Sequence, residues 1–422
     1  MLGVLISIIK VVVLLGFLIF IHEGGHFLMA KLFKVKVLEF AIGFGPTIWS
    51  KQGKETKYAI RLIPLGGFVN MLGEEERSEE EGSYSKKSIP KRIGILLAGA
   101  TVNIVFGILV YFVLICTANS SYVSTTVNEL IPNYSAEIAG IKPGDKILQI
   151  NNKKIKVKED VDNYLLNYNN EYLEILVQRE NEKINIETKA TEVNTKTVGI
   201  YLGAEGSDLS TEIKSLYKDG PAEKAGIKQK DKIIKVNDID ASFDAMKAVE
   251  LIQNTEGDTV KLTILRGEET LDFLIDAEII TAYKLGVLFE EVDNSIGNRL
   301  YYGFWETERF AFSIIENLKR LFTGNVGVDQ LMGPVGISEV VVETKDITQY
   351  VYILALISLS LGVTNLLPFP PLDGGKVVIL LVEAIRRKPL KENVEVGIQM
   401  VGFFILIALS LYVTFNDVVR IF

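Results

Sequence analysis

Four long apolar stretches constrain the fold of this chain more than any other feature of its sequence. They run from about 4 to 30, 93 to 116, 350 to 372 and 396 to 413. A helix needs roughly 20 apolar residues to cross a bilayer, so each stretch predicts one transmembrane span. The first stretch resembles a signal peptide in composition, but no small-residue cleavage site follows it. The sequence therefore predicts a multi-pass α-helical membrane protein with four transmembrane helices.

Basic residues near the ends of these stretches predict the orientation of the chain. Lysines follow the first span, lysines and an arginine precede the second, and a basic cluster separates the third from the fourth. Because loops rich in Lys and Arg stay in the cytoplasm, the long segment 119–349 is expected outside it. The formal net charge of −8 argues against nucleic-acid binding, which usually needs a basic surface.

The chain has only two histidines, and both lie in the sequence HEGGH near the predicted cytoplasmic end of the first span. His22 and His26 share one face of a helix and can bind one metal ion. Zinc accepts imidazole nitrogen, and Glu23 can take a proton from the attacking water. Ionisable groups inside a membrane are functional by default. Gly24 and Gly25 weaken the helix, so they predict close packing against a neighbouring helix.

A catalytic zinc ion usually has three protein ligands and one open position. No third histidine exists and Cys116 is the single cysteine, so the third ligand is expected to be a carboxylate. Asp373, in the sequence NLLPFPPLDGG, is the only acidic residue between 349 and 383. It follows the third span at the depth predicted for the histidines, where three prolines break the helix. The expected metal centre is one zinc ion bound by this carboxylate and the two histidines.

The segment between the second and third spans repeats itself. SAEIAGIKPGDKILQINNKKI at 135–155 aligns with PAEKAGIKQKDKIIKVNDIDA at 221–241. Such a repeat indicates two copies of one unit, and the shared AGIK string with its following D, I and N resembles the PDZ domain of bacterial membrane proteases. PDZ domains bind extended peptides at a sheet edge, which implies clefts for peptide termini at Gly199 and Gly286. The alternative is that the modules are spacers or a steric shield and bind nothing.

The polar segment 297–324 carries aromatic residues at helical spacing. It fits an interfacial amphipathic helix and equally a helix packed against the domains. The acidic run EEERSEEE at 74–81 indicates a solvated cytoplasmic loop. The expected organisation is an N-terminal membrane part at 1–118, PDZ domains at 119–204 and 205–290, a linker region at 291–349 and a C-terminal membrane part at 350–422.

The sequences HEGGHF and NLLPFPPLDGG and the four-span plan resemble the site-2 protease family of intramembrane zinc metalloproteases, in particular its bacterial members with two PDZ domains. The resemblance implies His22, His26 and Asp373 as zinc ligands and Glu23 as general base. It implies that Asn365 positions the substrate or stabilises the oxyanion. It also implies a bacterial inner membrane location, with the active site towards the cytoplasm. The second span reads AGATVN where the family carries AGPxxN, a departure that concerns the local bend and not the chemistry.

The sequence at 40–72 resembles the membrane-dipping β-hairpin region of the same family. Its glycine-containing edge would pair with an unwound substrate strand, and the residues expected there are Leu65, Gly66, Gly67, Phe68 and Val69. The implied substrates are transmembrane segments of single-pass membrane proteins, such as trimmed anti-sigma factors or remnant signal peptides.

Two other functions compete with proteolysis. A non-enzymatic PDZ membrane scaffold with a structural metal would need four protein ligands, and the sequence offers no obvious fourth. A transporter could use the intramembrane His and Glu as a proton relay, but this leaves the repeated module and NLLPFPPLDGG unexplained. A zinc-dependent metalloendopeptidase is therefore the expected activity.

Overall fold

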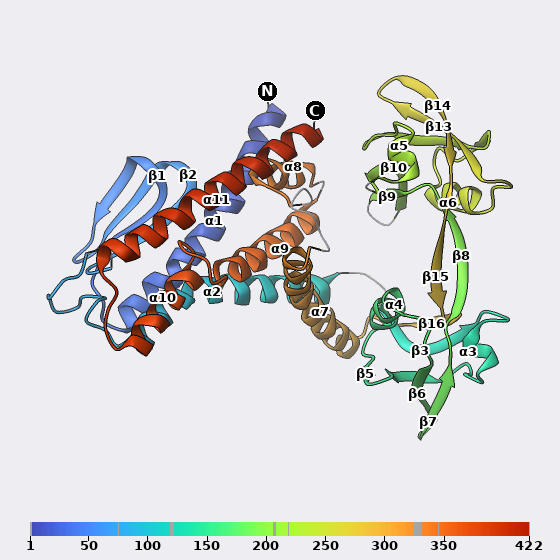
Figure 1. Cartoon of the computed structure of the whole chain (residues 1–422), viewed down its shortest axis with the longest axis horizontal. Coiled ribbons are helices and arrows are strands. Elements are labelled where there is room, and N and C mark those ends of the chain that lie inside the picture. The colour runs from blue at the N-terminus through green and yellow to red at the C-terminus, as the bar shows by residue number, and fades with distance from the viewer. Residues whose placement is uncertain are drawn as a thin grey trace. The chain divides into compact units, whose positions relative to one another are not determined.

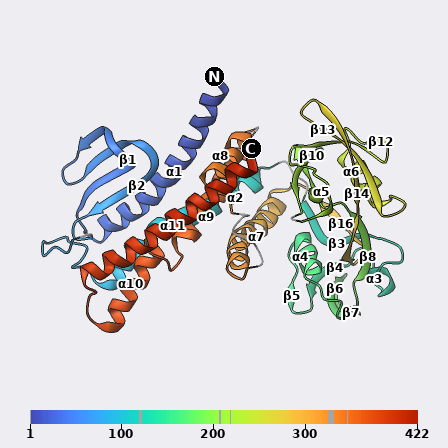
Figure 2. The same ribbon diagram turned by 45° about the horizontal axis from the view of Figure 1, so that its top comes forward.

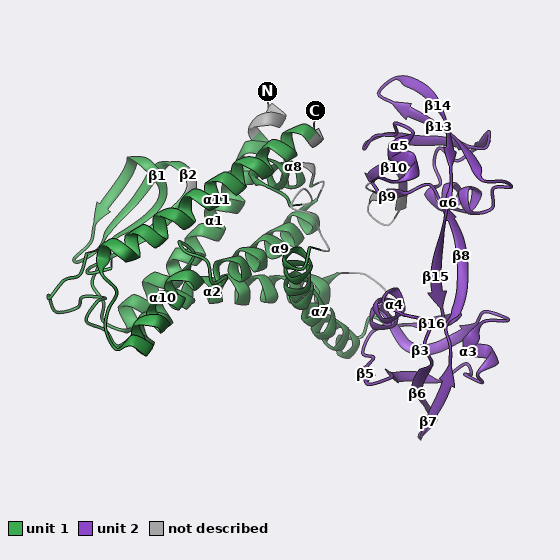
Figure 3. Cartoon of the chain, in the orientation of Figure 1, with its two compact units in different colours: residues 1–120, 293–422 green, residues 121–292 purple. Residues whose placement is uncertain are grey.

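The computed structural model describes residues 2–74, 76–118, 122–205, 208–217, 219–324, 331–344 and 346–421. Two compact units form (Figure 3). Unit 1 combines Met1–Ser120 with Asp293–Phe422, and unit 2 is Ser121–Val292. Unit 1 is therefore built from both ends of the sequence, and unit 2 contains the repeated segment. Part of the expected linker region, 325–330, lies outside the described residues.

Among the described residues, four helices of unit 1 are long and apolar enough to cross a membrane. They are α1 (Leu2–Leu32), α2 (Ile89–Thr117), α9 (Ile347–Asn365) and α11 (Glu392–Ile421). The four predicted apolar helices are thus confirmed. The third ends at Asn365 and not at Leu372, because prolines in the next residues lack the N–H donor that a helix needs.

Helix α2 packs against both α1 and α9, and these three helices lie together in both views (Figures 1 and 2). Small residues permit the approach: a methyl group built on Gly25 of α1 would lie 2.7 Å from the backbone oxygen of Ala98. One built on Gly362 of α9 would lie 2.8 Å from that of Ala100. Membrane helices often associate through such contacts. The predicted close packing is confirmed at Gly25, whereas Gly24 has nothing within 4 Å.

A bent pair of strands, β1 (Val37–Gln52) and β2 (Lys57–Met71), confirms the β region expected at 40–72. The first part of β1, residues 39–42, lies opposite 57–60 on one side and opposite 67–70 on the other. In the described pairing, 67–70 therefore has a neighbouring strand on one side only. Its other edge has backbone groups that can pair with a further strand.

Three further helices complete the described part of unit 1, namely α7 (Ile296–Phe322), α8 (Pro334–Glu343) and α10 (Asp373–Arg386). Helix α7 packs on α2, where the Phe310 and Tyr111 rings stack with centroids 3.9 Å apart. Leu300, Phe304 and Phe312 are exposed on α7. Helix α7 thus packs on a helix of unit 1, and its exposed apolar residues fit an interfacial helix.

Unit 2 contains two modules, each with one six-stranded sheet and two short helices. We call them the outer and inner modules. The outer module comprises β3 (Tyr122–Leu130), α3 (Ser135–Ile138), β4 (Lys146–Ile150), β5 (Lys153–Lys154), α4 (Lys158–Leu166), β6 (Leu173–Arg179), β7 (Glu182–Thr188) and β16 (Val287–Val292). The inner module comprises β9 (Ile200–Glu205), β10 (Asp208–Leu216), α5 (Pro221–Lys224), β11 (Lys232–Val236), β12 (Ile239–Asp240), α6 (Ala245–Gln253), β13 (Thr259–Arg266) and β14 (Glu269–Asp276).

The inner module is inserted into the outer one. The first sheet has the order β16-β3-β4-β6-β7 and the second β14-β13-β11-β10-β9, with β5 and β12 beside β4 and β11. Strand β16, from the end of the unit, pairs with β3 at its start, and Val292 lies opposite Tyr122. Two antiparallel strands, β8 (Thr191–Thr197) and β15 (Glu278–Lys284), connect the modules.

This insertion separates the two predicted cleft glycines from their own repeats. The carbonyl oxygen of Gly286 accepts a hydrogen bond from the N–H of Ile131 in the outer module (2.8 Å). The carbonyl oxygen of Gly199 accepts one from the N–H of Tyr217 in the inner module (2.9 Å). The domain boundary expected between 204 and 205 therefore does not separate the two sheets. Strand β9, which follows Gly199, belongs to the inner module, and strand β16, which follows Gly286, belongs to the outer module.

The same ion pair stabilises each module and supports the alignment of the repeats. Asp145 accepts hydrogen bonds from Nε and Nη2 of Arg179, both at 2.8 Å. Asp231 accepts the equivalent bonds from Arg266 at 2.8 and 2.7 Å. Burial opposes ionisation of Asp145, but the Arg179 guanidinium and the N–H of Lys142 outweigh it and hold the pKa of this carboxyl below its ordinary value.

Candidate metal centre

Two imidazole rings on α1 face one point inside unit 1. The Nε2 atoms of His22 and His26 are 3.2 Å apart, as the spacing of four residues predicts. Nδ1 of His26 lies 2.8 Å from the backbone oxygen of Ile95 on α2. A carbonyl can only accept, so this Nδ1 carries the proton and the Nε2 lone pair is available to a cation.

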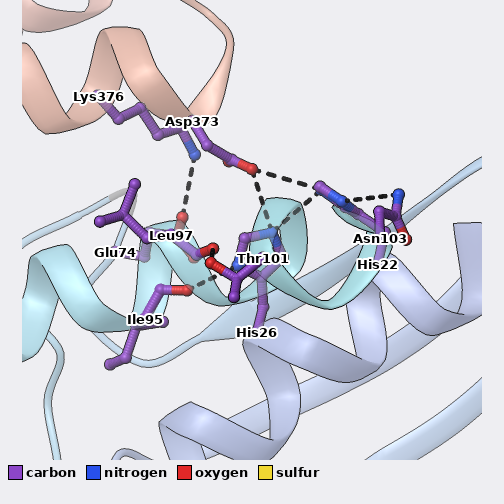
Figure 4. A network of polar contacts seen from close by, with 9 residues as sticks. All are labelled: His22, His26, Glu74, Ile95, Leu97, Thr101, Asn103, Asp373 and Lys376. Atoms are coloured by element: carbon purple, nitrogen blue, oxygen red, sulfur yellow. Dashed lines mark hydrogen bonds and ion pairs between the residues drawn. The ribbon is translucent and has the colours of Figure 1, made fainter. Parts of the chain in front are cut away.

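Asp373, the first residue of α10, supplies a third ligand atom to the same point (Figure 4). Its Oδ2 atom lies 3.4 Å from Nε2 of His22 and 3.4 Å from Nε2 of His26. The structure therefore brings together the two histidines and the carboxylate that the sequence pairs across more than three hundred residues.

The glycines of the LDGG sequence determine where Asp373 lies. A methyl group built on Gly374 would lie 2.2 Å from the carbonyl oxygen of Leu366, and one on Gly375 would lie 2.2 Å from the nitrogen of Pro370. Only residues without a Cβ allow the segment 366–372 to fold back onto the start of α10. This close contact places the carboxylate beside α1.

The three ligand atoms fit a zinc ion. Zinc binds nitrogen and oxygen at about 2.0–2.2 Å in tetrahedral geometry, which places neighbouring ligand atoms about 3.3 Å apart. The three observed separations are 3.2, 3.4 and 3.4 Å. In addition, Oδ2 of Asp373 is buried without a hydrogen-bond partner among the described residues. A bound cation would satisfy this oxygen, which otherwise costs free energy.

A cavity of about 640 Å³ adjoins the three ligands and contains the predicted general base. Glu23 lines it together with Gly67, Phe68 and Val69 of β2. A methyl group built on Gly67 would lie 3.0 Å from Cγ of Glu23, so this residue of β2 lies beside the Glu23 side chain. Of the other two predicted edge residues, Gly66 has a φ of +127° and is not among the lining residues, and the side chain of Leu65 lies outside the described residues.

The cavity wall includes charged residues that the sequence analysis did not identify. Nζ of Lys376 forms an ion pair with Glu74 at 3.1 Å (Figure 4). Arg77 and Arg92 both pair with the buried Glu383 of α10, at 3.2 and 3.3 Å. The interpretation of 74–81 as a solvated loop is therefore wrong for Glu74, whereas Arg77 is exposed although it is ion-paired. Sequence spacing could have identified Lys376 as a residue of this site. It lies three residues after Asp373, so the two side chains share one helix face.

Three predicted site residues remain, one in unit 1 and two in unit 2. Asn365 is the last residue of α9, is half-buried, and is not among the residues that line the cavity. Gly199 and Gly286 belong to unit 2. The roles of these three residues stay predictions.

Comparison with known proteins identifies the family. The model of peptidase family M50 matches residues 10–409. The chain belongs to peptidase family M50. It is 29% identical over 457 residues to the regulator of sigma-E protease RseP of Escherichia coli, covering 100% of both chains. It is 30% identical over 434 residues to the zinc metalloprotease RasP of Geobacillus kaustophilus, covering 99% of this chain and 98% of that protein.

Among solved structures, the PDZ domain of HtrA3 bound to a phage-derived ligand aligns with 22% of this chain and 92% of its own. The sequence identity is 21% and the TM-score 0.19. Membership of family M50 makes the chain an intramembrane zinc metalloprotease, a metalloendopeptidase of the site-2 type. It is a bacterial membrane protein, and the alternative of a non-enzymatic scaffold is not favoured.

Proposed function

We propose that this M50 peptidase binds one zinc ion through His22, His26 and Asp373 and uses Glu23 as the general base. One observation carries the assignment: three ligand atoms of the kinds zinc prefers lie 3.2–3.4 Å from one another. When bound, zinc would polarise the scissile carbonyl and lower the pKa of the attacking water. No fourth protein ligand from the described His, Cys, Asp and Glu residues joins this group, which suits a catalytic site with an open position.

The position of Glu23 supports its proposed role as the general base. Its carboxylate takes a proton from the attacking water and passes it to the leaving amine. It lines the cavity next to the ligands, and the edge of β2 lies beside it. We assign Asn365 to substrate positioning or oxyanion stabilisation, a role that requires it to approach the substrate from the end of α9.

The substrate edge of the site is the unpaired side of β2 at Gly67, Phe68 and Val69. A transmembrane substrate is a helix whose peptide groups are already hydrogen-bonded, so it must unwind before water can attack. Backbone groups of an edge strand replace the lost hydrogen bonds by β-augmentation. The close approach of Gly67 to Glu23 would bring a paired substrate strand to the general base.

We further propose that the metal centre lies towards the cytoplasmic side and that unit 2 lies outside the cytoplasm, because the basic clusters flank the membrane spans in that pattern. Substrates would be single-pass membrane proteins, with trimmed anti-sigma factors and remnant signal peptides as the expected classes. The two modules of unit 2 would be PDZ domains, and the loops at Gly199 and Gly286 their peptide clefts.

The role of Glu23 is tested with purified Glu23→Gln protein. We expect wild-type zinc content and an unchanged melting temperature, together with loss of cleavage of a membrane-embedded reporter. Retained cleavage would exclude Glu23 as the base. Glu39→Gln is a suitable control, because Glu39 is an acidic residue of β1 that pairs with Arg61 (2.8 Å) and is not among the cavity-lining residues.

The role of Asp373 is tested by metal analysis of Asp373→Asn. Zinc occupancy should fall, since a neutral amide is a much weaker ligand than a carboxylate. Glu383→Gln is the matched control on the same helix: it should lower stability through Arg77 and Arg92 but keep the metal. Full zinc occupancy in Asp373→Asn would show that the third ligand lies elsewhere.

A further inference from the structure

Asn103 of α2 is a buried polar residue with an unexplained side chain. Its exposed fraction is 1%. Its Nδ2 atom lies 3.5 Å from Nδ1 of His22, and its Oδ1 atom has no hydrogen-bond partner among the described residues. Buried polar atoms normally have partners. An orphaned amide oxygen next to a metal-site histidine therefore requires an explanation.

The tautomer of His22 supplies one. Nε2 of His22 faces Asp373 and Nε2 of His26, so its lone pair must be free if it is a metal ligand. The ring proton of neutral His22 then lies on Nδ1, as it does in His26, where Nδ1 donates to the carbonyl of Ile95 (2.8 Å). An Nδ1–H facing the Nδ2–H₂ of Asn103 places donor against donor, which is unfavourable.

Rotation of the Asn103 amide by half a turn removes this conflict. Oxygen and nitrogen of an amide have nearly the same shape, and their assignment follows from the hydrogen-bond network. In the rotated form Oδ1 accepts from Nδ1–H of His22. Figure 4 shows the Asn103 side chain beside His22, and the backbone oxygen of Asn103 accepts a separate hydrogen bond from Oγ of Ser358 on α9 (2.8 Å).

We propose that Asn103 is a positioning residue for the metal ligand His22, whose Nδ1–H it accepts through its side-chain oxygen. The proposal rests on the ligand role of His22 given above. Partners of this kind hold a ligating histidine in the correct tautomer and orientation, and their loss typically lowers metal affinity about 10–100-fold. The separation of 3.5 Å is long for a hydrogen bond, so we expect a loss near the lower end, about 10-fold.

The test measures zinc affinity of the full-length purified protein by competition with a chromogenic chelator. Asn103→Leu keeps the approximate size but cannot accept, and should bind zinc about 10-fold more weakly. Asn103→Asp keeps the acceptor and should bind at least as well as wild type. A second readout is the visible spectrum of the Co²⁺-substituted protein, which reports ligand geometry and should change in Asn103→Leu only.

Controls separate this proposal from a general effect on packing and from the ligand assignment itself. Ser358→Ala removes a contact of the same helix turn without touching the ring, and should leave zinc affinity unchanged. If Asn103→Leu fails to fold, the zinc affinities of Asn103→Ala and Asn103→Asp are compared instead. Wild-type zinc affinity in Asn103→Leu or Asn103→Ala would overturn the positioning role. So would a zinc affinity of Asn103→Asp as low as that of these variants. Unchanged zinc binding in His22→Ala would instead overturn the ligand assignment.

Discussion

Gly99 of α2 lies directly against the metal-facing atom of His26, and Gly99→Ala should therefore destroy the zinc site. A methyl group built on Gly99 would lie 2.4 Å from Nε2 and 2.8 Å from both Cδ2 and Cε1 of His26. Non-bonded atoms of this kind prefer about 3.5 Å, so the ring or the helix must move by about 1 Å. Metal–ligand distances tolerate only about 0.2 Å.

The ring has little freedom to yield. Its Nδ1 is hydrogen-bonded to the carbonyl of Ile95 (2.8 Å), and α1 is held against α2 at Gly25. We expect an overpacking cost of about 1–3 kcal/mol in the free energy of unfolding. Because the added methyl occupies the space in front of a ligand atom, zinc affinity should fall by at least the 10–100-fold that loss of an outer contact causes.

Metal analysis of dialysed protein, chelator competition and cleavage of a membrane reporter measure these effects. Gly24→Ala is the matched control, because a methyl group there meets nothing within 4 Å. It should keep zinc and stabilise α1 by up to about 1 kcal/mol. Wild-type zinc affinity in Gly99→Ala would refute the reasoning that this glycine provides space for the His26 ring.

Three further predictions concern other parts of the chain. The lowered pKa of Asp145 means that its stabilising effect is present above its unfolded pKa of about 3.9 and is lost as pH falls through the folded value. The protection factor of the β4 amides, which is the intrinsic exchange rate divided by the observed rate at the same pH, should therefore fall in acid in wild type, and Asp145→Asn should remove this fall. Lys376→Met should leave zinc content unchanged but increase amide exchange of 73–85 by releasing Glu74, at a cost of about 1 kcal/mol. Zinc chelation should abolish proteolysis reversibly while circular dichroism stays constant, because α1 is held against α2 at Gly25 and Ala98, a contact that involves none of the three ligand atoms.

The grouping of His22, His26 and Asp373 could be predicted because its signals are local. The spacing of His22 and His26 determines that they share a helix face, and Asp373 is the only acidic residue near the end of its span. The separate roles of Gly24 and Gly25 could not be predicted, because the helix contact depends on which face of α1 meets α2. The sequence AGATVN lacks the proline of AGPxxN, and α2 continues through 98–103 as a helix.

Other features could not be predicted because they depend on contacts between residues far apart in the sequence. The pair formed by Glu74 and Lys376 joins residues separated by 302 positions, and neither sequence neighbourhood indicates the other. The insertion of one module into the other was hidden for a different reason. Two equivalent repeats have equivalent strands, so the sequence alone does not determine which copy of the final strand completes which sheet.

The insertion has a consequence for how such a chain can vary in length. Strands β8 and β15 pair from Thr191 opposite Lys284 to Thr197 opposite Glu278, so the inner module occupies the position of a hairpin tip. A two-residue turn from 197 to 278 would close that hairpin and leave every strand of the outer module in place. Closure entropy rises slowly with the number of inserted residues. A whole module can therefore be gained or lost at this tip while Tyr122 and Val292, the paired entry and exit of unit 2, keep their spacing.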